Sequence, residues 1–78
     1  MEIDILILSP AGVIFEGKAG SITLPGEQGV FEVLPFHKAI LSRLISGTLF
    51  VGEQSISIRR GLVSVNQNKV TIIAEEAG

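Results

Sequence analysis

The residue of this chain best suited to catalysis is His37, the single histidine of the sequence. A histidine acts as a general base when a nucleophile and an orienting carboxylate lie beside it. Ser42 and Ser46 follow it along the chain, and Glu27 and Glu32 precede it. No carboxylate is spaced to orient His37 against either serine, and carboxylates without a pocket more often form a solvated rim. The pattern therefore favours a structural or binding role for His37 over a catalytic one.

Other kinds of site find little support. The absence of cysteine excludes disulfides and thiolate zinc sites, and a single histidine argues against other transition-metal sites. The segment GEQG at residues 26–29 is not a phosphate loop, because Glu27 would repel phosphate and no lysine follows. Lys69 in NQNK leaves one alternative open, a biotinyl or lipoyl carrier domain with a modified lysine at a hairpin tip. Its neighbours are Asn68 and Val70 rather than the Met or Asp typical of carriers.

Composition argues against two further classes of protein, those that bind nucleic acid and those that span a membrane. The net charge is −2, with six Lys and Arg residues and no Trp or Tyr, so the chain lacks the basic patch and stacking groups that nucleic-acid binding needs. The longest apolar stretch, AILSRLISGTLFVG, is interrupted by Arg43, Ser46 and Gly47 and is too short to span a bilayer. The opening MEIDILILSP carries acids where a signal peptide needs positive charge. We therefore expect an intracellular protein without a targeting peptide.

The elements that carry these residues are expected to be strands, because β-branched residues alternate with polar ones between turn signals. HKAILSRLISG is compatible with a helix, but its β-branched content and Gly47 favour a strand. Turns are predicted at residues 9–12, 25–29 (where Gly26 is able to take positive φ), 51–54 and 66–69. The predicted strands are residues 2–8, 13–24 as one or two strands broken near Gly17 and Gly20, 29–34, 38–45, 48–51, 54–60, 61–66 and 69–75. Residues 1–78 thus form one all-β domain, a flattened two-sheet β-sandwich or barrel of about eight to ten short strands.

Several strands are apolar on both faces. Ile3, Ile5 and Ile7 share one face of the first strand, while Leu6 and Leu8 occupy the other. The same holds for Phe50 against Leu49 and Val51, and for Ile73 against Val70 and Ile72. A sandwich buries one face of each strand, so the second face calls for a partner. The alternative is that the sheets curl and bury both faces at barrel corners.

Three segments share an order of residues typical of one family. Residues 26–42 hold a turn glycine, a branched aliphatic residue, a proline, a histidine and an aliphatic pair: Gly29, Val33, Pro35, His37, Ile40 and Leu41. The opening and the end of the chain contribute Ser9, Pro10, Phe15, Gly17, Gly61, Leu62, Val70, Thr71, Ala74, Glu75 and Ala77. Over its whole length the sequence resembles the N-terminal β-sandwich domain of the epsilon subunit of F-type ATP synthases, the subunit called delta in mitochondria.

The resemblance implies a mechanical function without cofactors. It implies a non-catalytic rotor subunit in the central stalk of a proton-translocating ATP synthase, which docks the gamma subunit onto the membrane c-ring and couples rotation to ATP synthesis. One apolar face would pack against gamma, and a turn at one end would rest on the polar loops of the c-ring. The location implied is the cytoplasmic face of the bacterial inner membrane, peripheral and reached through partners only.

Carried over residue by residue, the resemblance implies two contact regions. One is the ring-facing turn, matched by Gly26, Glu27, Gln28, Gly29, Val30 and Phe31. The other approaches gamma and is matched by Ser9, His37 and Leu41. For His37 the alternative is a hydrogen bond that only shapes its own turn after Pro35.

The sequence also departs from the family pattern. Glu32 and Phe36 replace family glycines and Ala39 replaces a second proline, which predicts a backbone that avoids glycine-only φ and a reshaped turn around His37. The family usually continues into a C-terminal helical hairpin, which is absent from these 78 residues. The chain is either a naturally short subunit or the N-terminal domain of a longer one, and the hairpin's inhibitory and ATP-sensing roles are not assigned to it.

Overall fold

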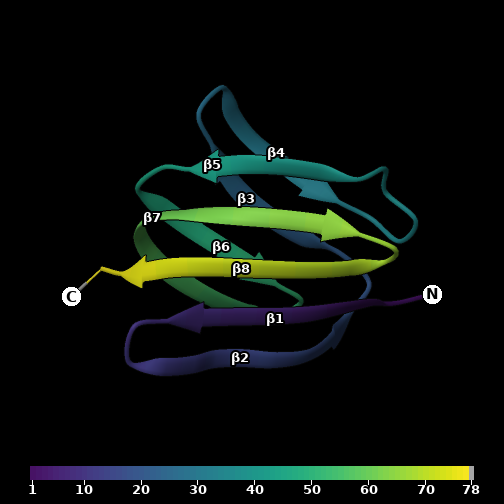
Figure 1. Cartoon of the computed structure of the whole chain (residues 1–78), viewed down its shortest axis with the longest axis horizontal. Coiled ribbons are helices and arrows are strands. Elements are labelled where there is room, and N and C mark those ends of the chain that lie inside the picture. Colours follow the sequence, from purple (N-terminus) through teal and green to yellow (C-terminus); the bar gives the residue numbers. More distant parts are fainter. Residues whose placement is uncertain (78) are drawn as a thin grey trace.

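The computed structural model describes residues 1–77, and this part of the chain contains eight strands and no helix. The all-β class and the number of strands agree with the sequence prediction (Figure 1). The strands are β1 (Ile3–Ser9), β2 (Gly12–Ala19), β3 (Ile22–Gly26), β4 (Gly29–Val33), β5 (Ile40–Leu44), β6 (Gly47–Val51), β7 (Gln54–Asn66) and β8 (Lys69–Glu76).

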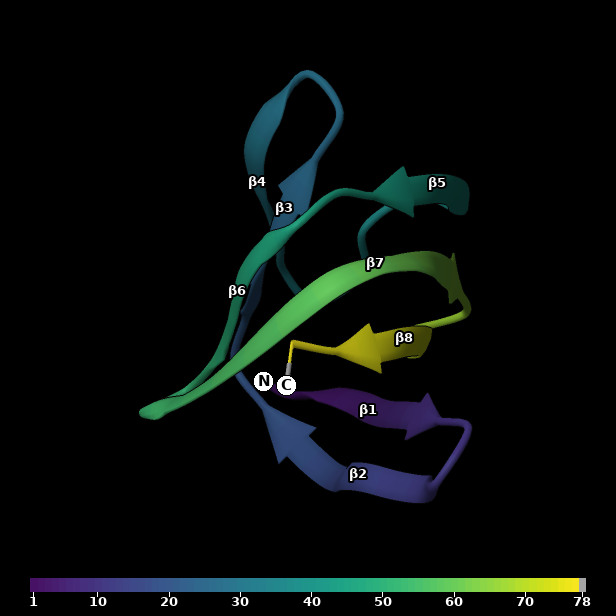
Figure 2. The same ribbon diagram turned by 90° about the vertical axis from the view of Figure 1, so that its left-hand side faces the viewer.

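The strands form two layers that share the long strand β7. The hydrogen-bonded order is β2-β1-β8-β7-β5-β3-β4, with β6 paired to β3 and β7. The second half of β7 pairs with β5 and β8, which with β1 and β2 form what we call the front layer. The first half pairs with β6, which with β3 and β4 forms the back layer, fainter in Figure 1. Figure 2 shows β7 crossing from one layer to the other.

The core lies between the layers and is made by alternate residues of nearly every strand, as the period of two predicts. Ile3, Ile5 and Ile7 all point inward, with at most 2 % of each exposed. Within residues 1–77, no charged or polar side chain is buried. The other buried residues of the hydrophobic core are Ala19, Ile22, Leu24, Val33, Leu44, Leu49, Val51, Ile58, Val63, Val65, Val70, Ile72 and Ala74.

Strand β7 is continuous, although the sequence pattern predicts two strands divided after Arg60. The structure has a β-bulge there, because Ile58 pairs with Glu76 and Arg60 already pairs with Glu75. A bulge bends a strand and re-aims its side chains. Arg59 and Arg60 are consequently both exposed, although successive residues of a regular strand point to opposite faces. The bend is what lets β7 serve both layers.

Gly61, directly after the bulge, is required by close packing. A Cβ atom built there would lie 2.7 Å from the backbone oxygen of Ile73 and 3.2 Å from the Cβ of Ala74. Only glycine allows β7 to approach β8 so closely.

Two other predicted boundaries differ from the structure. Gly17 does not break a strand, since β2 runs through it and the break falls at Gly20 and Ser21. The phenyl ring of Phe15 covers the place of the missing side chain, 3.4 Å from where a Gly17 Cβ would be. The strand predicted at residues 38–45 is confirmed as a strand but spans only Ile40–Leu44.

The two predicted hairpin turns of the later strands are confirmed. Gly52, with φ of 57°, begins the β6–β7 turn. Gln67 and Asn68 form the β7–β8 turn with φ of 48° and 61°. Positive φ at both central residues is the requirement of a type I′ turn, the type that matches the twist of paired strands.

Candidate partner-binding surface

The predicted ring-facing residues form the β3–β4 hairpin, which projects from the sandwich at the top of Figure 2. Glu27 and Gln28 make the turn itself, and both are exposed. Val30, the second residue of β4, is 73 % exposed beside the turn. The end of the hairpin therefore presents one carboxylate, one amide and one aliphatic side chain.

Gly26 does not use the positive φ that its lack of a side chain allows; Gly29 takes positive φ in this hairpin, at 121°. Gly26 is the last residue of β3 and pairs with Gly29 in regular register. A side chain at Gly26 is excluded by the aromatic ring of Phe31, because an added Cβ would lie 2.7 Å from the ring. The Phe31 ring thus packs directly on the backbone of its own hairpin.

The β4–β5 connection contains the tight turn that carries His37. The amide of His37 donates to the carbonyl of Leu34 at 3.2 Å, with Pro35 and Phe36 between them. Phe36 has a φ of 65°, so the prediction that its replacement of a glycine would force another backbone is wrong. A left-handed phenylalanine costs conformational energy, which the surroundings must offset. The imidazole Nδ1 of His37 lies 2.7 Å from the carbonyl oxygen of Lys38, a contact within its own loop.

Asn68 supplies the offsetting contacts, a role that no local sequence pattern indicates. Its side-chain oxygen accepts a hydrogen bond from the amide of Phe36 at 3.0 Å. Its side-chain nitrogen donates to the carbonyl of Glu2 at 2.8 Å, and its own carbonyl accepts from the amide of Asp4 at 3.2 Å. One turn residue thus joins the β7–β8 turn, the start of β1 and the turn that carries His37.

The outer face of the front layer carries a continuous apolar row across four strands. Register places Val13 of β2 beside Leu8 of β1, Leu8 beside Ile73 of β8, and Ile73 beside Leu62 of β7. Three of these side chains are about half exposed: Val13 at 59 %, Ile73 at 57 % and Leu62 at 48 %. We call Val13, Leu8, Ile73 and Leu62 the apolar row. Its exposure confirms that the chain does not bury both faces of these strands.

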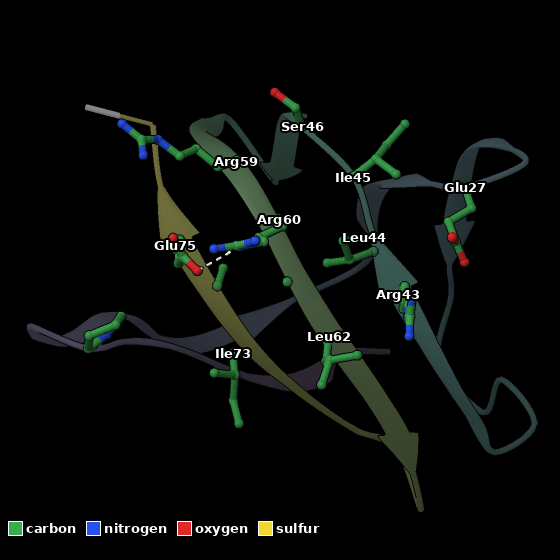
Figure 3. Close-up of a pocket in the computed structure, with 13 residues that line it drawn as sticks. Glu27, Arg43, Leu44, Ile45, Ser46, Arg59, Arg60, Leu62, Ile73 and Glu75 are labelled. Atoms are coloured by element: carbon green, nitrogen blue, oxygen red, sulfur yellow. Dashed lines mark hydrogen bonds and ion pairs between the residues drawn. The ribbon is translucent and has the colours of Figure 1, made fainter.

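A groove of about 620 Å³ lies beside the end of the apolar row formed by Leu62 and Ile73 (Figure 3). We call it the front groove. Across it, Arg60 Nε donates to Glu75 Oε2 at 2.7 Å. This hydrogen bond, and next the positive charge of Arg60, lower the pKa of the Glu75 carboxyl, and the same bond raises the pKa of Arg60. The lining residues are Pro10, Glu27, Arg43, Leu44, Ile45, Ser46, Arg59, Arg60, Gly61, Leu62, Ile73, Ala74 and Glu75.

The residues expected on the gamma-facing side do not form one cluster. Leu41 is 78 % exposed on β5, where it pairs with Ser64 of the front layer. Ser9 ends β1 and closes the β1–β2 turn, its hydroxyl donating to the carbonyl of Gly12 at 3.3 Å. His37 lies in the β4–β5 connection, at the opposite end of the sheet from Ser9 in Figure 1. Phe50, 49 % exposed, belongs to β6 in the back layer and is separate from the apolar row.

The residues weighed for catalysis are not assembled. Within residues 1–77, no hydrogen bond joins His37 to a serine, and the Ser42 hydroxyl contacts the carbonyl of Arg43 at 3.4 Å. In the same range no three His, Cys, Asp or Glu side chains lie close enough to hold a metal ion, and no helix long and apolar enough to cross a bilayer occurs. Lys69 is the first residue of β8, paired with Asn66, and is not at the hairpin tip.

Comparison with known proteins gives concordant results. Residues 2–78 match the family described as the beta-sandwich domain of the ATP synthase delta/epsilon chain. The chain is 41% identical to the ATP synthase epsilon chain of Nitratiruptor sp. over 91% of its length, and 37% identical to that of Sulfurimonas denitrificans over 97%. It covers 59% and 62% of those relatives, so it spans about three fifths of their length.

Solved structures share the fold. A chain of the Euglena gracilis mitochondrial ATP synthase, in a structure of its OSCP, F1 and c-ring, superposes with a TM-score of 0.86 at 25% identity, covering 99% of this chain and 52% of that one. A chain from the central stalk and c-ring of the Tetrahymena thermophila mitochondrial enzyme gives 0.79 at 16% identity, covering 97% and 65%.

Proposed function

The chain belongs to the family of ATP synthase delta/epsilon beta-sandwich domains, and from that premise we propose that it acts as a non-catalytic central-stalk subunit of a proton-translocating F-type ATP synthase. In this role it docks the gamma subunit onto the c-ring and transmits rotation between them. Two hydrogen-bonded layers around one core suit a part that must pass on torque, because well-packed strands resist local opening more than loops do.

The apolar row is the observation that carries the proposal. Leu8, Leu62, Ile73 and Val13 lie side by side on four neighbouring strands, and three of them are about half exposed. A contiguous exposed apolar surface on a small domain is typical of a protein interface. Leu41, 78 % exposed on the outer face of the same layer, extends this surface toward His37. We assign the surface to gamma.

The β3–β4 hairpin is the proposed contact with the c-ring. Glu27 and Gln28 at its tip offer hydrogen-bonding groups to polar loops, and Val30 adds a small apolar contact. Phe31 holds the hairpin over Gly26, so the tip is braced against bending. The protein would then sit at the cytoplasmic face of the bacterial inner membrane, held there by its partners.

No observation favours the carrier-domain alternative. A modified lysine must reach out from a hairpin tip, but Gln67 and Asn68 form the tip here. Lys69 lies within the ladder, paired with Asp4 on one side and Asn66 on the other. A mass increase on Lys69 in protein isolated from its source would reopen this alternative.

The test is direct binding of the chain to the gamma subunit of the same organism, measured by isothermal titration calorimetry. We expect a one-to-one complex that Leu62→Asp weakens, because a carboxylate in place of an apolar interface residue must be desolvated. Ser57→Asp, an exposed change on the first half of β7 away from the apolar row, is the matched control. Absence of binding by the unmodified chain would refute the proposed function.

A further inference from the structure

All three arginines of the chain line the front groove, whereas none of its three lysines does. With Glu27 and Glu75, the groove carries three arginines and two glutamates, a net charge of +1 in a chain whose net charge is −2. Its floor is apolar and continuous with the apolar row through Leu62 and Ile73. The groove therefore differs in charge from the molecule as a whole and joins the surface already assigned to a partner.

The bulge in β7 is what gathers the charge. Without it, Arg59 and Arg60 would point to opposite faces, and one guanidinium would enter the core. Arg60 is then held by Glu75 at 2.7 Å. Within residues 1–77, neither Arg43 nor Arg59 forms an ion pair, so two guanidinium groups beside the apolar floor have their donors free.

We propose that the front groove recognises an acidic segment of the gamma subunit whose apolar side chains cover Leu62 and Ile73 and whose carboxylates pair with Arg43 and Arg59. Guanidinium groups bind carboxylates through two parallel hydrogen bonds, and arginine is enriched at interfaces. A second copy of this chain fits less well, since groove against groove would oppose three arginines to three arginines. The inference rests on the proposed function and adds the chemistry of the partner segment.

The experiment compares two double charge reversals on the same outer face of the front layer. Arg43→Glu with Arg59→Glu alters the groove, and Lys18→Glu with Lys69→Glu makes the same change of charge at the other end of the face, on either side of Asp4. We expect the arginine variant to bind gamma about tenfold or more weakly, and the lysine variant to change affinity by less than about twofold. All four residues are exposed, and far-UV circular dichroism checks that both variants fold.

The affinity should also respond to salt and to the partner. Raising ionic strength should weaken binding of the unmodified chain more than that of the arginine variant. Salt screens the ion pairs made by Arg43 and Arg59, and the variant no longer makes these pairs. Replacing the matching gamma carboxylates with lysine should restore binding of the arginine variant. Equal losses in both double variants would overturn the inference while leaving the proposed function standing. Absence of binding by the unmodified chain would refute both the inference and the proposed function. If the unmodified chain self-associates and the arginine variant does not, as measured by sedimentation equilibrium, the groove binds a second copy instead.

Discussion

Two adjacent isoleucines on β8 provide the sharpest test of which face meets a partner. Ile72 is fully buried between the layers, where it pairs with Val63 and Ile7. Ile73 points outward in the apolar row and is 57 % exposed. The same substitution, isoleucine to alanine, can therefore be made on both faces of one strand at neighbouring positions.

The two changes should act on different equilibria. Fully burying an isoleucine contributes about 1.5–3 kcal/mol, so covering the 57 % of Ile73 that is exposed contributes about 0.9–1.7 kcal/mol to binding, or about four- to twentyfold in Kd. Ile73→Ala should weaken gamma binding by that factor and lower the free energy of unfolding by about 1 kcal/mol, because less than half of Ile73 is covered in the isolated domain. Ile72→Ala should lower the free energy of unfolding by about 2–5 kcal/mol, because it leaves a cavity in the core.

Stability is best measured by urea unfolding followed by far-UV circular dichroism, because the chain has no Trp or Tyr to report by fluorescence. Binding is measured by calorimetry under conditions where each variant is folded. If Ile73→Ala destabilises the isolated domain as much as Ile72→Ala while gamma binding is unchanged, the apolar row belongs to the internal packing and is not a partner surface.

Three further outcomes are expected. Gly26→Ala should lower the free energy of unfolding by about 1–3 kcal/mol, since its Cβ would overlap the Phe31 ring, and an unchanged urea midpoint would contradict the packing described for the hairpin. The hydrogen bond from Arg60 lowers the pKa of Glu75 in the folded chain. The resulting stabilisation is therefore present above the ordinary pKa of 4.5 and is lost as pH falls through the folded pKa. Glu75→Gln should remove this part of the pH dependence of the thermal midpoint. Asn68→Gly keeps positive φ accessible but removes two side-chain hydrogen bonds, so amide hydrogen exchange should accelerate in the β4–β5 connection and not in the core strands.

The sequence predicted the strands and their buried faces well because both follow from local alternation. Ile3, Ile5 and Ile7 are buried as expected, and Gln67 with Asn68 forms the expected turn. Strand periodicity and turn residues act over a few positions, so they are legible without knowing the partner strand.

The sequence predictions failed where a residue distant in sequence determines the local backbone conformation. Gly26 was expected to turn the chain, but the ring of Phe31 accounts for its lack of a side chain. Phe36 keeps a left-handed conformation because Asn68, distant in sequence, accepts a hydrogen bond from its amide. The break expected after Arg60 is a bulge, whose only local sign is the paired charge at Arg59 and Arg60.

The candidate surface was partly foreseeable. The exposure of Ile73 follows from strands with two apolar faces, but the adjacency of Leu8, Ile73 and Leu62 depends on register across β1, β8 and β7. Phe50 also lies on a strand with two apolar faces, but that strand belongs to the back layer. The residues of β6 alone do not indicate to which layer the strand belongs. Periodicity thus assigned each residue to a face of its own strand, and only the topology assigned that face to a layer.

The first and last strands of the chain are neighbours, for β1 runs parallel to β8 from Asp4 beside Lys69 to Leu8 beside Ile73. Among the strands of residues 1–77, β8 is the one that pairs the β1–β2 hairpin with the rest of the sheet. The opening hairpin can therefore take its place in the sheet only after β8 has been synthesised. Completion of the front layer thus depends on contacts between residues far apart in the sequence, which slow folding.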